Sequence, residues 1–158
     1  FSGMDRIGLS KAMAAAEHVE RVNPAVDFTP VSSFLNEQGM FELFQNADVA
    51  VDCLGGLTSR LAAQHAASRA GIPLVTAALA GWSGYVGSVF PGAPGPAELF
   101  PSQGAAAEDS LGCPAPSVVY AAALQANEVL RILSSETPAP CPLLFFDLGE
   151  PSLERVTL

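Results

Sequence analysis

The three residues Leu54, Gly55 and Gly56 directly follow the segment 48–53 (DVAVDC), which is expected to form a short buried strand. In an open α/β sheet, ligands bind outside the carboxyl ends of the strands. Two adjacent glycines at such an end let a ligand approach the backbone closely, or they simply make a tight turn before the next helix. The residues alone therefore predict either a binding loop or a structural turn, and they leave the two readings open.

Other residue types that could do chemistry are isolated from one another. The three cysteines are odd in number and never spaced as CxxC, which predicts free thiols in a reducing compartment rather than disulfides or a zinc ribbon. The histidines lie in expected helices without further metal ligands at the required spacing. Adjacent acids in a loop could serve acid chemistry, but solvated side chains are the default. The residues in question are Cys53, Cys113, Cys141, His18, His65, Glu108 and Asp109. These residues alone identify no reaction.

Charge excludes one class of partner. The 158 residues include 7 Lys and Arg against 16 Asp and Glu, a formal net charge of -9, and Lys11 is the only lysine. The basic residues are scattered singly, so they form no stripe that could bind nucleic-acid phosphates. Apolar stretches are too short to span a bilayer and no signal peptide opens the chain, so we expect a soluble, cytoplasmic protein that contacts no membrane.

The expected elements alternate between helices and strands. Helices are expected at 11–22, 39–45, 57–70 and 118–134, the last capped by Ser117 and well buried, and strands at 26–35, 48–53, 72–79, 84–90, 143–148 and 153–158. The 84–90 strand follows its predecessor too closely for a parallel crossover, so it is expected to be antiparallel, and the last two strands to form a hairpin. Residues 91–117 are expected to be a long mobile loop. This order predicts one α/β domain over 1–158, with an open, mostly parallel sheet, antiparallel strands at its C-terminal side and helices on both faces.

Short stretches in this order resemble the ThiF/MoeB/HesA family of adenylyltransferases, which are related to ubiquitin-activating enzymes. The matching segments are DRIGLSKA at 5–12, RVNP at 21–24, VDCLGG at 51–56 followed by Arg60, GIPLV at 71–75, GYVGSVFP at 84–91, LQANEVLR at 124–131 and LFFD at 144–147. The resemblance covers nearly the whole chain and implies a Rossmann-like fold.

The resemblance implies an ATP- and Mg²⁺-dependent enzyme. Such an enzyme adenylates the C-terminal Gly-Gly of a ubiquitin-like sulfur-carrier protein of the thiamine or molybdopterin type. It implies that Lys11 touches ATP phosphates, and that Leu54, Gly55, Gly56 and Arg60 contribute to the binding of ATP. It also implies that Cys113 is a candidate for the loop thiol that many members use, and that the chain pairs with a second copy or a homologous subunit.

The chain also departs from the family pattern. The glycine-rich phosphate loop of the family is expected before Phe1, so the domain is expected to be incomplete at its N-terminus. Gly55 stands where the family has its magnesium-binding aspartate, and Asp52 is placed too early to replace it. Gly95 and Glu98 stand at the first pair of zinc-binding cysteines, so no zinc is expected.

These departures keep other functions open. The family's loop cysteine aligns with Glu108, five residues before Cys113. A catalytically degenerate member that acts as a binding or dimerisation module is therefore the alternative to an enzyme. A nicotinamide-dependent oxidoreductase is a weaker third reading, because a GxGxxG loop is missing.

Overall fold

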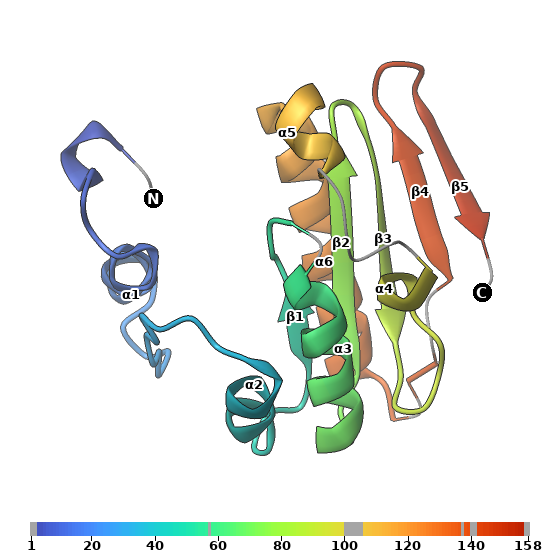
Figure 1. Ribbon diagram of the computed structural model, residues 1–158. Helices are drawn as coiled ribbons and strands as arrows, with labels where there is room; N and C mark the ends of the chain where they lie inside the picture. The colour runs from blue at the N-terminus through green and yellow to red at the C-terminus, as the bar shows by residue number, and fades with distance from the viewer. Residues whose placement is uncertain (1–2, 57, 100–105, 137, 140–141, 157–158) are drawn as a thin grey trace. The chain divides into compact units, whose positions relative to one another are not determined.

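The computed structural model describes residues 3–56, 58–99, 106–136, 138–139 and 142–156 (Figure 1). Its internal contacts divide the chain into two compact units, Phe1–Leu35 and Asn36–Leu158. One domain over 1–158 stays a prediction. In the first unit, a 3₁₀ helix, Met4–Arg6, precedes α1, Lys11–Val22, as predicted. An ion pair between Arg6 and Glu17 connects the two helices.

The strand predicted at 26–35 is wrong, because these residues form no strand in the structure. Its apolar side chains Val26, Phe28, Val31 and Phe34 are exposed, and Phe34 is 91% exposed. The strand was expected because the segment is rich in β-branched and aromatic residues, but such residues form a strand only where a neighbouring strand and a core cover them. Proline at position 30 also removes one hydrogen-bond donor.

The second unit contains a five-stranded sheet in the order β1-β2-β3-β4-β5. Its strands are β1 Ala50–Asp52, β2 Leu74–Ala80, β3 Ser83–Val89, β4 Leu143–Asp147 and β5 Ser152–Val156. The pair β1–β2 is parallel and the other three pairs are antiparallel. The α/β class, the antiparallel β3 and the C-terminal hairpin are therefore confirmed. The expectation of a mostly parallel sheet does not hold for the described strands, because only one crossover helix, α3, joins two of them.

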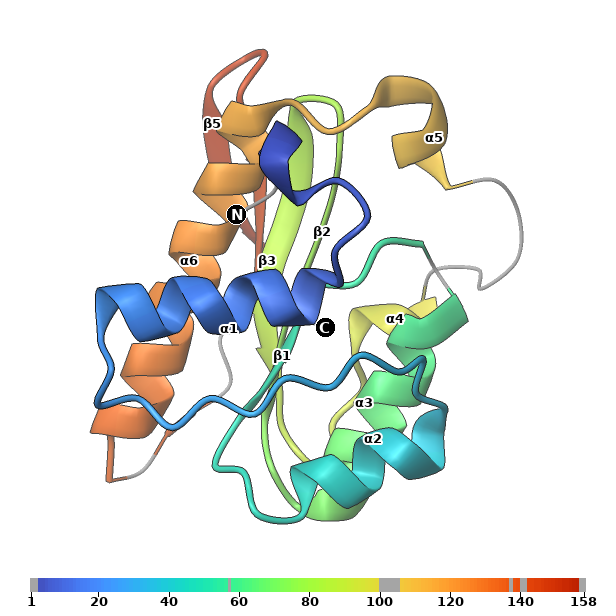
Figure 2. The same ribbon diagram turned by 90° about the vertical axis from the view of Figure 1, so that its left-hand side faces the viewer.

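Helices cover both faces of this sheet, as predicted (Figure 2). On one face, α3, Thr58–Ala70, packs through Ala67 on Ala50 and Leu74. On the other face, α6, Ala115–Ser134, packs through Ala121 on Ala77. The helix α2, Glu37–Phe44, lies against α3.

The helix α6 differs from its expected form at its start and in its burial. Ser117 does not cap it; Pro114 occupies the N-cap position, and Ser117 lies fully buried within the first turn. The helix is not buried all round, since Val119 and Leu130 are each 67% exposed. Its apolar residues nearly encircle it, but the sheet covers only one side.

The predicted loop 91–117 contains helical turns. The described part includes α4, Pro96–Leu99, α5, Ala107–Leu111, and the first turn of α6. Elements of four and five residues are too short to show a helical period, which explains why the sequence pattern missed them. Residues 100–105 of this loop, and Cys141, lie outside the described residues.

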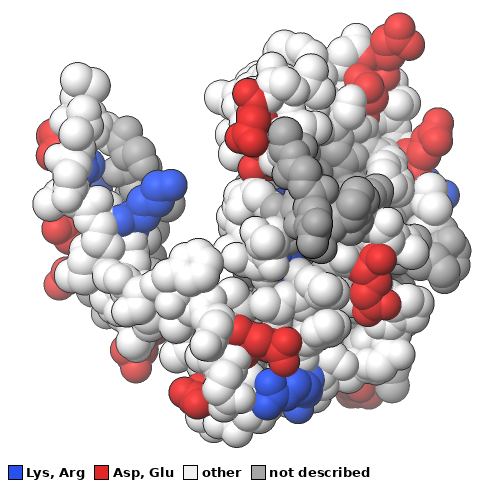
Figure 3. All heavy atoms as spheres, in the orientation of Figure 1, with Lys and Arg blue, Asp and Glu red and all other residues white. Residues whose placement is uncertain are grey.

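Charges on the protein surface are mostly negative. On the face drawn in Figure 3, acidic side chains are dispersed and basic side chains gather in small separate groups. None of the described helices is both long enough and apolar enough to cross a membrane.

Candidate functional site

The candidate site lies at the carboxyl end of β1, where Asp52 leads into the loop before α3. The parallel register places Asp52 beside Thr76 of β2. The Thr76 hydroxyl donates to Asp52 Oδ2 at 2.8 Å, and the Leu54 backbone N–H donates to Oδ1 at 2.9 Å. Because Asp52 is only 2% exposed, its charge needs a cationic partner.

Arg60 of α3 is that partner, and its side chain also fixes the loop. Its Nη1 donates to Asp52 Oδ2 at 2.8 Å, and its Nε donates to the carbonyl of Gly56 at 3.0 Å. The same guanidinium donates to the carbonyls of Leu54 and Ala77. A planar fork of donors suits this task, because it satisfies several acceptors at fixed angles. The buried ion pair therefore holds the loop from inside.

The loop is also attached to α6. Gln125 of α6 donates through Nε2 to the carbonyl of Asp52 at 2.8 Å, and its Oε1 lies 3.7 Å from the sulfur of Cys53. Partial burial, and secondly the negative charge of Asp52, raise the pKa of the Cys53 thiol above its usual value, while Arg60 acts in the opposite direction. Cys53 is therefore a poor thiolate nucleophile near neutral pH.

Glu108 of α5 reaches the same loop from outside. The Gly56 backbone N–H donates to Glu108 Oε1 at 2.8 Å. A Cβ atom at Gly55 would lie 3.4 Å from that same oxygen. Sequence reasoning treated Glu108 as a solvated loop acid. The sequence signals that could have singled it out were its adjacency to Asp109 and its alignment with the family's loop cysteine.

A pocket of about 490 Å³ opens next to this loop. Arg60 and Glu108 lie in its wall, and the remaining walls are mostly apolar. They come from β2, the start of β3, α4, α5 and β4, with Leu79, Gly84, Tyr85, Phe145 and Phe146 among the lining residues. A Cβ atom at Gly84 would lie 2.6 Å from the Ala78 carbonyl and from the Phe146 ring, so only glycine fits at this position.

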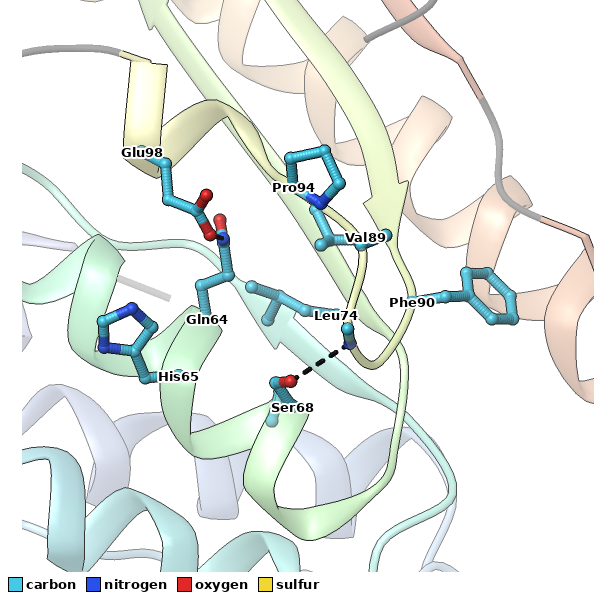
Figure 4. Close-up of a pocket in the computed structure, with 11 residues that line it drawn as sticks. Gln64, His65, Ser68, Leu74, Val89, Phe90, Pro94 and Glu98 are labelled. Atoms are coloured by element: carbon cyan, nitrogen blue, oxygen red, sulfur yellow. Dashed lines mark hydrogen bonds between the residues drawn. The ribbon is translucent and has the colours of Figure 1, made fainter.

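A second cavity, of about 310 Å³, lies near the other end of β2 (Figure 4). Gln64 of α3 donates to Glu98 Oε1 of α4 at 2.6 Å at its wall. The Gly95 backbone packs directly on the end of the Gln64 side chain, which would have to move to admit a Cβ atom at this position. The family pattern has its first pair of cysteines at the positions of Gly95 and Glu98. In this chain the two residues instead join α3 to α4, Gly95 by direct packing and Glu98 by a hydrogen bond.

The structure brings together some of the predicted site residues. Leu54, Gly55, Gly56 and Arg60 form one network. Lys11 is exposed at the first position of α1 and belongs to the N-terminal unit. Cys113 is exposed between α5 and α6.

Metal ligands are sparse around this network. Among the described residues no group of three or more His, Cys, Asp or Glu side chains could hold a metal ion. Both oxygens of Asp52 already accept hydrogen bonds, so Asp52 does not fit as a magnesium ligand. Glu108 remains the carboxylate at the loop that fits such an ion, because Mg²⁺ in nucleotide sites needs only one or two carboxylates beside the phosphates and water.

Comparison with known proteins gives consistent results. The ThiF family model matches residues 3–158. The adenylyltransferase and sulfurtransferase MOCS3 of Xenopus laevis is 29% identical over 164 residues, which cover 99% of this chain and 36% of that protein. The sulfur carrier protein ThiS adenylyltransferase of Bacillus subtilis is 31% identical over 145 residues, which cover 89% of this chain and 42% of that protein. The chain thus spans about two fifths of the length of these relatives.

Solved structures support the fold. The crystal structure of MccB from E. coli with ATP superposes with a TM-score of 0.73 at 18% identity, over 99% of this chain and 50% of that one. At this identity the likeness concerns the arrangement of helices and strands, which is Rossmann-like as expected.

Proposed function

The chain belongs to the ThiF family, and we propose that it takes part in ATP-dependent adenylation of a C-terminal carboxylate on a small ubiquitin-like sulfur-carrier protein. The observation that carries the proposal is the loop 54–56, which the buried Asp52–Arg60 pair fixes at the carboxyl end of β1. This edge of a parallel strand pair is where α/β sheets bind their ligands. The name of the Bacillus subtilis relative supplies the reaction type and the class of substrate.

The reaction requires the carrier's terminal carboxylate to lie in line with the bond that breaks in ATP. An oxygen of the carrier's terminal carboxylate attacks the α-phosphorus of ATP, the bond from that phosphorus to the bridging oxygen breaks, and pyrophosphate leaves with the bond's electrons. The product is an acyl adenylate. Chemistry of this kind depends mainly on positioning and on neutralising phosphate charge.

We assign the residues of this chain to separate tasks. Gly55 and Gly56 let nucleotide approach the backbone, and Leu54 continues that surface. Arg60 holds the loop in shape rather than contacting the nucleotide, since its donors already bind Asp52 and backbone carbonyls. Lys11 offsets phosphate charge, and Mg²⁺ supplies further neutralisation when bound.

The carrier's tail requires a separate path. The pocket of about 490 Å³ borders both Glu108 and Arg60 and has mostly apolar walls. An extended chain end without large side chains, such as Gly-Gly, can enter it and bring its carboxylate to the loop. We therefore place the tail of the carrier protein in this pocket.

The free cysteines and the exposed apolar residues of α6 bear on the location and assembly of the protein. Cys53 and Cys113 are free thiols, which suits the reducing cytoplasm. The exposed apolar residues of α6, Val119 and Leu130 among them, suit pairing with a second copy or a homologous subunit. Cys113 is accessible, so its thiolate can attack the acyl carbon of the adenylate in a later step, forming a thioester as the acyl–phosphate bond breaks and AMP leaves.

A catalytically degenerate binding module is the second candidate. The observation that favours it is Gly55, which offers no carboxylate at the position where the family resemblance implies one. Such a protein would bind the carrier protein without exchanging pyrophosphate into ATP.

ATP–pyrophosphate exchange separates the two candidates. We expect the purified protein to exchange labelled pyrophosphate into ATP only when a carrier ending in Gly-Gly is present. Lys11→Ala should reduce exchange strongly, and Arg21→Ala, an exposed basic residue of the same helix, is the matched control. Carrier binding without any exchange would support the degenerate module instead.

A further inference from the structure

The carboxylate of Glu108 lies where a side chain at position 55 would point. Glu108 Oε1 is 2.8 Å from the Gly56 nitrogen and would be 3.4 Å from a Cβ atom at Gly55, which is ordinary van der Waals contact. The two groups are 52 residues apart in the sequence. A short helix thus delivers a carboxylate to a loop that has no acid of its own at its tip.

The other acid at this loop is fully engaged. Asp52 is 2% exposed, with Oδ1 accepting from Leu54 and Oδ2 accepting from Arg60 and Thr76. Glu108 differs, since the Gly56 contact engages one oxygen and no hydrogen bond from the described residues reaches the other. Glu108 also lies in the wall of the pocket of about 490 Å³, where a ligand can reach it.

We propose that Glu108 is the carboxylate that binds magnesium in the ATP complex and that it takes the place of an acid at position 55. The inference rests on the proposed function. Mg²⁺ at nucleotide sites keeps several waters and binds through one or two carboxylates and the substrate phosphates, so one side chain on the loop is sufficient. The hydrogen bond from Gly56 fixes this carboxylate before any ion arrives.

This proposal differs from a purely structural role for Glu108 in a measurable way. Glu108→Gln keeps an oxygen that can accept from the Gly56 N–H, but it removes the negative charge. Glu108→Ala removes both. A structural role predicts that only the alanine variant matters, whereas a metal-binding role predicts that both variants lose the ion.

The geometry also allows a rescue. Gly55 does not have a positive φ, and the nearest atom to a Cβ atom there is the end of the flexible Glu108 side chain. Gly55→Asp can therefore be accommodated in the Glu108→Gln background, where it returns one carboxylate to the same place.

Mn²⁺ binding in the presence of a non-hydrolysable ATP analogue, followed by electron paramagnetic resonance, tests the proposal without turnover. Analogue affinity in EDTA is measured in parallel. We expect Glu108→Gln to weaken Mn²⁺ binding about tenfold or more and to leave metal-free analogue affinity unchanged. Gly55→Asp/Glu108→Gln should recover most of the binding, and Asp109→Asn, the exposed neighbour, should resemble the wild type.

Three outcomes would overturn the inference. Wild-type Mn²⁺ affinity in Glu108→Gln, with loss only in Glu108→Ala, would show that Glu108 merely supports the loop. Failure of Gly55→Asp to restore binding would show that the two positions are not equivalent. If the wild type bound no ATP analogue, either in EDTA or with Mn²⁺, the proposed function would fail together with the inference. Failure of the inference alone would leave analogue binding intact, so the two failures are distinguishable.

Discussion

The guanidinium of Arg60 donates to the carboxylate of Asp52 at 2.8 Å in the interior of the protein, where their side chains are only 7% and 1% exposed. The pair joins the last residue of β1 to the first turn of α3 and so fixes the loop between them. A buried ion pair can cost as much in desolvation as it returns in attraction, so its value here is mainly the single shape that it imposes on the loop.

Removal of Arg60 should destabilise the protein, because it leaves the Asp52 charge buried without a partner. We expect Arg60→Leu to lower the free energy of unfolding by about 3–5 kcal/mol in urea denaturation. Asp52→Asn/Arg60→Leu should lose less than the two single variants added together. Arg155→Leu, at an exposed position of β5, is the control. Strict additivity would contradict the pairing.

Gly84 should tolerate no larger residue. Its missing Cβ atom would lie 2.6 Å from backbone at Ala78, which cannot move without disturbing β2. Gly84→Ala should therefore lower the free energy of unfolding by about 1–3 kcal/mol. Gly55→Ala, which meets only a flexible side chain, should change it by no more than about 0.5 kcal/mol. Equal effects of the two substitutions in thermal or urea unfolding would refute this packing.

The Cys53 thiol should react slowly with iodoacetamide in the folded protein. Partial burial and the nearby Asp52 charge raise its pKa, so less thiolate is present at a given pH than in an ordinary cysteine. The labelling rate of the Cys53 peptide can be measured by mass spectrometry from pH 7 to 10. This rate should increase at a higher pH in the native protein than in urea. The same midpoint in both states would show that the fold does not shift this pKa.

A single charge on the exposed side of α6 should disrupt pairing without unfolding the chain. Leu130 is 67% exposed, so Leu130→Glu costs little in the isolated chain but places a charge in an apolar interface. We expect light scattering to show a dimer for the wild type and a monomer for Leu130→Glu, with unchanged circular dichroism. Glu154→Lys on exposed β5 should remain dimeric. A monomeric wild type would exclude the proposed interface.

The sequence predicted the elements whose patterns are strong. Continuous apolar character revealed β2, and alanine-rich stretches revealed α1 and α3. The apolar stretch 26–35 misled the prediction, because strand pairing depends on neighbours that a local pattern does not contain. The short helices α4 and α5 were missed because four or five residues are too few to show a helical period.

The site was partly predictable for the same physical reasons. Gly55, Gly56 and Arg60 stand close together in the sequence, so a motif could identify them. Glu108 could not be found in this way, because its contact with Gly56 joins segments that only the folded chain brings together. Sequence reasoning set Asp52 aside as a substitute for the missing acid, and it did not predict that Arg60 would pair with it.

The central claim is that the protein adenylates a carrier protein at its C-terminus. The most direct test is intact-mass spectrometry of a ubiquitin-like sulfur carrier after incubation with the purified protein, ATP and Mg²⁺. We predict the addition of one AMP to the carrier, and no addition when its final Gly-Gly is deleted. A carrier whose mass never changes, although it binds the protein, would contradict the account and leave a binding module in its place.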